Sequence, residues 1–348
     1  MVFLFFGAVA FKDLLKPTVF NRFFLTFVIL SFLIFFVGFR YQSDNDFAVY
    51  VALYEAVPVF PNIGAIFAMT FSHGQETGYL LVKSILKALG FGPQSIFVFS
   101  TILMTFFLYK AFNKLAYYPI IALFIFFAQY FTLMFVQMRF GVATAISLYA
   151  CSILPNGQKR KFWLLFVLAL SFHLSTLGII ATYFLYKINW LNKNNIYRLF
   201  IIVIAAIFIS IRPIFEIALS IIGIARFEYY LTGDGAEIRS LAFLFIFILP
   251  FIIFRKNLAE KGVNVNLILS MSFASILVGA LVWQVGILNR FSIINASAIC
   301  VAISSYLLLL KSNSTKVIAY CLLILYCFLR FLPSMQWVTE YRMFFVSI

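Results

Sequence analysis

Three arginines each stand at the end of a long apolar run, where a guanidinium can offer several donors to an oxyanion. They are Arg40, Arg139 and Arg290. Taken singly, each could equally be a side chain that snorkels to lipid headgroups. Three together favour an anionic ligand held at a membrane surface, and a lipid-linked pyrophosphate fits both the charge and the depth.

Three further residues could transfer a proton. His173 lies at the midpoint of the apolar segment 162–186, and its free imidazole pKa near ~6.5 suits a base, an acid or a phosphate donor. In an ordinary protein such a histidine is more often packed and hydrogen-bonded, but within a membrane an ionisable group is a functional candidate. Glu76 and Asp46 are the other candidates, and their alternatives are a helix N-terminal carboxylate and a loop turn.

A metal or nucleotide site has little support. Asp44 and Asp46 form the one DxD pattern, and His73 and His173 are the only histidines, so we predict no metal and no cofactor. Phosphate-loop, dinucleotide-binding, zinc-protease and serine-elbow motifs are missing from the sequence. The cysteines lie in apolar segments without CxxC spacing and are expected to be plain buried or lipid-facing residues: Cys151, Cys300, Cys321 and Cys327.

The elements that must hold these residues are membrane helices. Hydrophobic residues make up 64% of the 348 residues and charged residues 11%, which excludes a soluble globule at about 45–50% apolar. The net charge of +15 is spread in short clusters between apolar runs, which is typical of topology signals and not of nucleic-acid binding. We expect an all-α, polytopic integral membrane protein with residues 1–348 as a single transmembrane domain.

The apolar runs predict about 11–12 membrane helices, with residues 1–11 as a short or tilted first helix. The clear spans are about 20–39, 93–111, 118–135, 139–154, 198–221, 240–254, 265–285, 291–310 and 316–333.

The segment 162–186 is either one span or a short hairpin broken at His173. A hairpin puts sixteen basic residues on one side of the membrane, whereas a single span moves eight of them, from Lys187 to Lys316, to the other side. The positive-inside rule therefore favours the hairpin and makes that side the cytoplasm. The external parts are then 40–92, 136–138, 222–239, 286–290 and the tail 334–348, with an amphipathic stretch at 77–91 along the outer interface.

Four short motifs, in order along residues 1–186, resemble the EpsG-like, Wzy-type polysaccharide polymerases. They are Gly38-Phe39-Arg40-Tyr41 with Asp46-Phe47 and Tyr50, then Glu76-Thr77-Gly78-Tyr79, Gln137 to Ala143, and Phe172-His173-Leu174-Ser175. Arg290-Phe291 and Tyr341 to Phe345 are weaker echoes in the second half. Two positions depart from the family pattern: Phe140 replaces a glutamine, and Phe47 replaces a tyrosine.

The resemblance implies a GT-C-like architecture and glycosyl transfer on the outer face of the bacterial inner membrane. A growing glycan would move from undecaprenyl pyrophosphate to the non-reducing end of a lipid-linked repeat unit, without nucleotide sugar or ATP. Implied partners are these glycans, membrane lipids, and a chain-length regulator and flippase. On these motifs Glu76, His173 and Asp46 are the candidate catalytic residues, Arg40, Arg139 and Arg290 the pyrophosphate ligands, and Tyr50, Tyr79, Gln137, Tyr229 and Tyr230 the substrate-binding residues.

An O-antigen ligase or a membrane acyltransferase is the nearest alternative, since either can use a histidine beside a cavity. A ligase is expected to carry a larger late external loop than 222–239. A transporter of lipid-linked glycan should show internal repeats or charges at mid-membrane in both halves, and neither is seen.

Overall fold

The computed structural model describes the chain except residues 1, 16–18, 209–237, 283–285, 339–340 and 345–348. The described residues are helical, with two isolated β-bridges and no strand, so the all-α prediction is confirmed. The chain divides into two compact units, one of residues 1–150, 159–174 and 310–348 and one of residues 151–158 and 175–309. We describe each unit by itself, and the single transmembrane domain stays a prediction.

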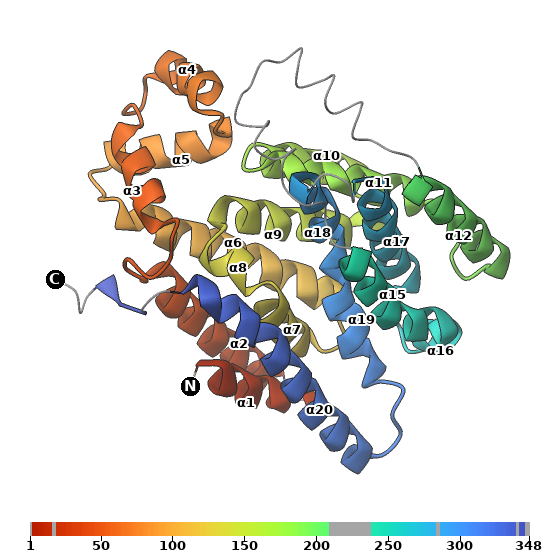
Figure 1. Cartoon of the computed structure of the whole chain (residues 1–348). Helices are drawn as coiled ribbons and strands as arrows, with labels where there is room; N and C mark the ends of the chain where they lie inside the picture. Colours follow the sequence, from red (N-terminus) through yellow and green to blue (C-terminus); the bar gives the residue numbers. More distant parts are fainter. Residues whose placement is uncertain (1, 16–18, 209–237, 283–285, 339–340, 345–348) are drawn as a thin grey trace. The chain divides into compact units, whose positions relative to one another are not determined.

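Apolar helices with aromatic contacts form the base of the first unit (Figure 1). α1 (Val2–Leu14) packs against α7 (Pro119–Gln129) and α20 (Asn313–Phe331). The ring of Phe3 lies 5.1–5.6 Å from those of Phe124, Phe328 and Phe331. The other helices of this base are α2 (Val19–Leu33), the π-helical turn η1 (Ile34–Gly38), α6 (Gln94–Leu115), α8 (Phe131–Phe135), α9 (Met138–Ser152), α10 (Lys159–Leu170) and η5 (Leu332–Trp337).

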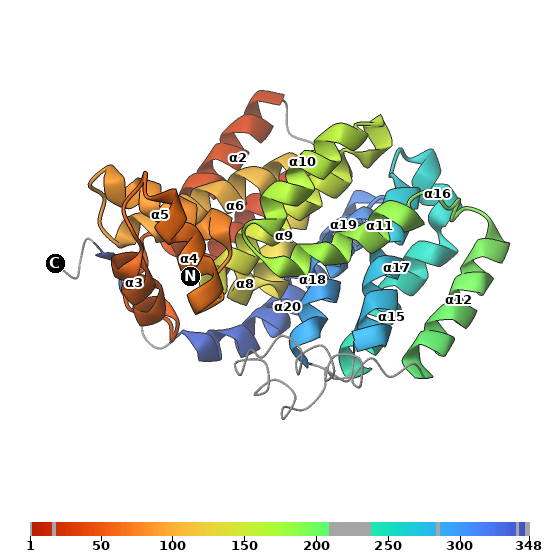
Figure 2. The same cartoon turned by 90° about the horizontal axis from the view of Figure 1, so that it is seen from above.

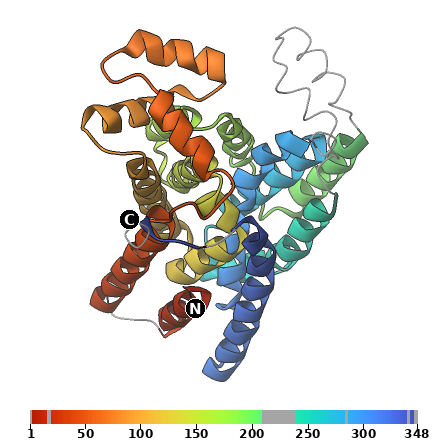
Figure 3. The same ribbon diagram turned by 60° about the vertical axis from the view of Figure 1, so that its left-hand side comes forward.

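The segment 40–92, predicted to be external, holds three helices where the sequence predicted one amphipathic stretch. They are α3 (Phe47–Ala56), α4 (Ile63–His73) and α5 (Thr77–Ala88). Figure 3 shows them (orange) grouped beyond the C-terminal end of α2. The Asn62 side chain accepts a hydrogen bond from Ala65 N and so caps α4. A small core of Val57, Ile66, Met69 and Leu80 joins the three helices.

The C-terminal tail pairs with the residues that follow η1. Tyr41 N donates to the Arg342 carbonyl at 2.9 Å, and Phe344 N donates to the Phe39 carbonyl at 2.9 Å. Isolated bridges join Arg40 to Met343 and Asp44 to Val338. Two segments about 300 residues apart therefore form one short connection, which no local pattern predicts.

The second unit is centred on α17 (Val265–Val282), which packs against α11 (Ile179–Leu185), α12 (Lys193–Phe208), α15 (Ile238–Ile253) and α18 (Arg290–Ala296). Figure 2 shows α12, α15 and α17 side by side. Buried polar pairs hold it: Thr182 Oγ1 donates to Asn295 Oδ1 at 2.7 Å, and Trp190 Nε1 donates to Ser270 Oγ at 2.8 Å. Its remaining elements are η2 (Leu154–Asn156), η3 (Leu174–Gly178, which begins at the last residue of the first unit), α16 (Arg255–Glu260), η4 (Gly286–Asn289) and α19 (Ala298–Tyr306).

Within the described ranges, four helical segments are long and apolar enough to cross a membrane: Gln94–Leu115, Met138–Asn156, Val265–Val282 and Asn313–Trp337. Several predicted spans are shorter apolar helices or are interrupted. The span 118–135 divides into α7 and α8, and 291–310 divides into α18 and α19. The segment 162–186 is broken beside His173, because α10 ends at Leu170 and η3 begins at Leu174. The part of 198–221 beyond Phe208 lies outside the described residues.

Candidate active site

An ion pair joins two of the predicted site residues. Arg139, in the first turn of α9, donates from Nη1 to Glu76 Oε2 at 2.7 Å, and each side chain is 20% exposed. Glu76 directly precedes α5 with extended backbone, and its side chain does not cap the helix. The carboxylate is therefore held by the guanidinium of a helix that begins 62 residues later. A short, charge-assisted bond in a partly desolvated place orients both groups.

Lys83 joins this pair from the buried face of α5. Its side chain is fully buried, lies 4.8 Å from the Tyr79 ring centroid, and donates to Gln75 Oε1 at 3.4 Å. Burial, and then the nearby Arg139 charge, lower the pKa of Lys83 to about 7. We name Glu76, Tyr79, Lys83 and Arg139 the Arg139 cluster. Arg139 is paired with Glu76, so the positive charge that Lys83 carries when protonated is the excess charge of this cluster.

Sequence reasoning missed Lys83, although a signal was present. Tyr79, Leu80, Lys83 and Ser84 follow the spacing of one helical face, and that face is the buried one. A lysine on the apolar face of an amphipathic helix needs a reason, because a buried ammonium is costly unless it is paired.

Tyr79, a member of the cluster, and the neighbouring Tyr50 are two of the predicted substrate-binding residues. Tyr79 is fully buried, its ring centroid lies 5.9 Å from Arg139 Cζ, and the Tyr50 ring meets it edge-on at 6.2 Å. Burial raises the pKa of the Tyr79 phenol, which keeps it a neutral donor. Its hydroxyl lies near Ser100, but among the described residues neither hydroxyl has a well-formed hydrogen bond.

The turn that carries His173 packs against the start of α5. Gly78 N donates to the Ser171 carbonyl at 2.9 Å, and the Phe172 ring meets Tyr79 edge-on at 6.3 Å. The His173 ring lies 4.9 Å from that of Phe140, the residue that departs from the family pattern. His173 is thus brought to the border of the Arg139 cluster through its neighbours, with its own ring against α9.

Arg40 is fully buried and held by its own chain. Its Nε donates to Asp44 Oδ2 at 2.7 Å, its Nη1 donates to the Val37 carbonyl at 2.9 Å, and its Cζ lies 4.7 Å from the Phe135 ring centroid. Within the described part of the chain Nη2 has no partner. The Arg40 charge also acts on Tyr79. This geometry organises the segment after η1, and a pyrophosphate role for Arg40 stays a prediction.

The remaining predicted residues are spread more widely. Asp46 precedes α3, is half-buried, and its charge acts on Tyr50. Gln137 precedes α9, and its carbonyl accepts from Gly141 N at 2.9 Å. Arg290 is the first residue of α18 and belongs to the second unit, and Tyr229 and Tyr230 lie outside the described residues.

The Asp44 carboxylate of the DxD motif has local partners. Asp44 Oδ2 accepts from Arg40 Nε, and Asp44 Oδ1 accepts from Asp46 N at 3.0 Å. In the part of the chain that the structure describes, no group of three or more His, Cys, Asp and Glu side chains is placed to hold a metal ion.

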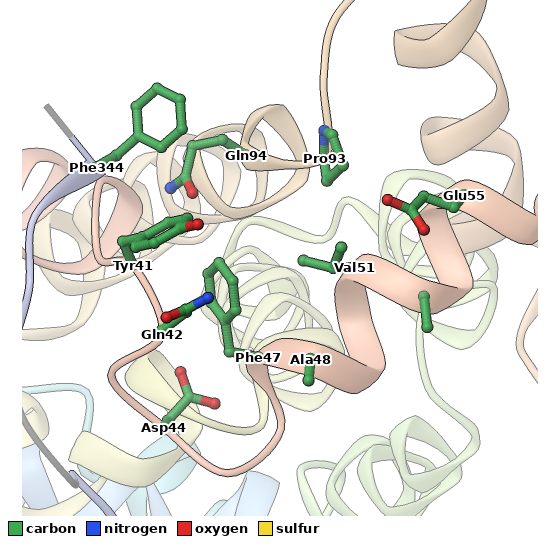
Figure 4. Close-up of a pocket in the computed structure, with 11 residues that line it drawn as sticks. Tyr41, Gln42, Asp44, Phe47, Ala48, Val51, Glu55, Pro93, Gln94 and Phe344 are labelled. Atoms are coloured by element: carbon green, nitrogen blue, oxygen red, sulfur yellow. The ribbon is translucent and has the colours of Figure 1, made fainter. Parts of the chain in front are cut away.

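A cavity of about 620 Å³ lies between the start of segment 40–92, the start of α6 and the tail, at the Arg40–Asp44 pair and not at the Arg139 cluster. Figure 4 shows Tyr41, Phe47 and Phe344 around it, with the carboxylate of Glu55 and the amide of Gln94. We name it the outer-loop cavity. Its full lining is Tyr41, Gln42, Asp44, Phe47, Ala48, Val51, Ala52, Glu55, Pro93, Gln94 and Phe344.

The comparisons with known proteins agree with the motifs. No protein of curated function and no solved structure matches the chain. The model of the EpsG family matches residues 22–342, which include the motifs of the first half, Arg290-Phe291, and the first two residues of the tail echo. This match supports a membrane protein with a polysaccharide-polymerase type of function, of the glycosyltransferase kind. The chain belongs to the EpsG family.

Proposed function

We propose that this protein is a polysaccharide polymerase of the bacterial inner membrane. It transfers a growing glycan from undecaprenyl pyrophosphate to the non-reducing end of a lipid-linked repeat unit on the outer face. The observation that carries the proposal is the Arg139 cluster, a largely buried set of an arginine, a carboxylate and a neutral tyrosine from family motifs, with the buried Lys83 beside them. Membership of the EpsG family supports the same reaction class.

Positive charge is what the departure of a lipid pyrophosphate needs. Negative charge develops on the leaving pyrophosphate oxygen, and fixed cations in a water-poor place stabilise it. Arg139 is oriented for this by Glu76, and Lys83 adds a second charge beside it. Arg40 and Arg290 remain further proposed pyrophosphate ligands on the basis of their motifs.

Glu76 is the proposed base. One of its oxygens is bound by Arg139 in the absence of substrate. When the guanidinium turns to the pyrophosphate, that oxygen becomes available to the hydroxyl of the acceptor sugar. The hydroxyl oxygen then bonds to the anomeric carbon, the bond from that carbon to the pyrophosphate oxygen breaks with its electron pair, and the proton goes to the carboxylate. Asp46 and His173 remain candidates for this role.

The distribution of basic residues supports the outward orientation. The clusters that follow the positive-inside rule leave the segment 40–92, and with it α5 and Glu76, on the external side. Lipid-linked repeat units would meet the enzyme there. A chain-length regulator and a flippase would be its functional partners.

The test is the length distribution of surface glycan in cells that carry Arg139→Ala or Arg139→Lys. We expect loss of the ladder and accumulation of carrier with single repeats, with the rate of polymerisation reduced about 10²–10³-fold, as for loss of a transition-state donor. Arg160→Ala is the control, since Arg160 is an exposed residue of α10. An unchanged ladder in the Arg139 variants contradicts the assignment, and a ladder retained on the carrier in cells lacking the protein indicates a ligase instead.

A further inference from the structure

The outer-loop cavity has the lining of a sugar site. Tyr41, Phe47 and Phe344 present aromatic rings, and aromatic faces pack well against the apolar faces of pyranose rings. Its volume of about 620 Å³ lies within the range of about 300–1,000 Å³ for small-ligand pockets. A short oligosaccharide fits such a space.

Polar groups suited to hydroxyls stand among these rings. Among the described residues Gln94 Oε1 is buried without a hydrogen-bond partner, so it needs a small side-chain movement to meet a ligand, while Gln94 Nε2 donates to the Gly38 carbonyl at 2.8 Å. Glu55 is exposed, and its carboxylate points to the Pro93 side of the cavity (Figure 4). An amide oxygen and a carboxylate are acceptors for sugar hydroxyls.

Backbone strain also falls on this lining. Gln42 has φ of 45°, the one positive value outside glycine in the described residues. Such a conformation is uncommon for a side chain of this kind and persists only where the surroundings enforce it. Here the pairing of Tyr41 with Arg342, and the bond between Ser43 Oγ and Arg342 N at 2.9 Å, hold the strained residue on both sides.

The cavity is built from three remote segments that are fixed to one another. The tail carries Phe344 and pairs with residues 39–43, and Gln94 bonds the carbonyls of Gly38 and Arg40. Asp44, one of the lining residues, is held by its ion pair with Arg40. A pocket held in this way is formed before the ligand arrives, which lowers the entropic cost of binding.

We propose that the outer-loop cavity is a saccharide-binding subsite that holds the sugar portion of a lipid-linked substrate. The inference rests on the proposed polymerase function and adds where the glycan lies. Because the charged groups of the lining are the carboxylates Asp44 and Glu55, the cavity disfavours a pyrophosphate and suits neutral or amino sugars. The anion and the glycan thus bind different parts of the external segment.

The test uses the purified protein in lipid nanodiscs and oligosaccharides released by mild acid from the surface glycan of the host cell. Saturation-transfer NMR measures binding to the wild type, to Ala52→Trp and to Ala56→Trp. Both alanines are exposed on α3 one turn apart, but only Ala52 lines the cavity. We expect binding to the wild type and Ala56→Trp, and at least about tenfold weaker binding to Ala52→Trp, as for a blocked pocket.

Phe344→Leu is a second variant, which removes an aromatic face while keeping most of its bulk, and it should also weaken binding. No transfer to the wild type, or equal binding by both tryptophan variants, overturns the proposal. Arg139→Ala separates the two hypotheses, because it should abolish polymerisation and leave oligosaccharide binding intact. If Arg139→Ala polymerises normally and Ala52→Trp still loses binding, the proposed role of Arg139 is wrong and the saccharide subsite remains supported.

Discussion

At the scale of single residues, the main feature is the set of groups that surround Arg139. A buried lysine on α5 lies near Arg139 of α9, and the Glu76 carboxylate is paired with Arg139. Desolvation and like charge both oppose such an arrangement in the absence of a ligand. An anionic ligand compensates both costs, which is the physical reason to place pyrophosphate here. An apolar residue at position 83 would stabilise the folded protein more than the buried lysine does.

The titration of Lys83 gives a prediction. Its pKa is lowered from 10.5 to about 7 by burial and by Arg139, so between pH 7 and 10.5 the unfolded chain binds a proton that the folded chain does not. Stability of the wild type should therefore rise with pH across this window, by at most about 1.4 kcal/mol per pH unit. The neighbouring Arg139 and Tyr79 keep their charge between pH 7 and 9, because arginine and tyrosine ordinarily titrate above this range and burial raises the pKa of Tyr79 further.

The measurement is the difference in melting temperature between the wild type and Lys83→Met in nanodiscs, from pH 6 to 9. Lys83→Met should be the more stable protein at pH 6, and the difference should shrink as the pH rises. A difference that is constant over this range contradicts the lowered pKa. Lys87→Met serves as control, because Lys87 lies one turn from Lys83 on α5 and its ammonium donates to the Glu55 and Val57 carbonyls at the end of α3.

At the scale of elements, the packing of α5 against the turn at 171–173 decides whether His173 reaches the site. A glycine is required at the contact, since a Cβ on Gly78 would overlap Ser171 Oγ and lie 2.8 Å from the Ser171 carbonyl oxygen. This close approach explains the glycine in the family motif Glu76-Thr77-Gly78-Tyr79 by space rather than by backbone conformation. The motif and the histidine turn are therefore one structural unit.

Gly78→Ala should separate these two elements. We expect at least about a tenfold loss of polymerisation, because a displacement of about 1 Å at a catalytic constellation costs about that or more. Gly64→Ala in α4 is the matched control: nothing lies within 4 Å of its added Cβ, and the helix should be unaffected or slightly stabilised. Surface glycan length and melting temperature are measured for both variants, and equal behaviour would refute the packing argument.

At the scale of the whole molecule, the basic residues and the apolar runs set the arrangement in the membrane. The proposed outward orientation of segment 40–92 can be tested with two single cysteines. Ser72→Cys in α4 should react with a membrane-impermeant thiol reagent added to intact cells, and Gln158→Cys should react only after the membrane is opened. Both positions are exposed in the structure. The wild type corrects for Cys321, its exposed native cysteine, and the reverse labelling pattern would place the Arg139 cluster inside.

Much of this protein follows from local sequence. The hydropathy of each run and the charges at its ends determined the membrane class, most helix positions and the break beside His173, because burial in lipid and positive charge at the cytoplasmic face act on each segment separately. The motifs around Arg139 and Glu76 identified the family and three residues of the cluster, Glu76, Tyr79 and Arg139. These signals need no knowledge of which helices touch.

Only the tertiary structure determined which of these side chains and segments contact one another. In the folded chain Glu76 pairs with Arg139, Lys83 is buried, and Arg40 is a buried partner of Asp44. The tail packs against the segment after η1, and together they form part of the outer-loop cavity. Each of these contacts depends on how helices distant in sequence pack and on which face they bury. Hydropathy and motif spacing describe each segment by itself. Which helix faces pack against each other is decided only when all the segments fold together.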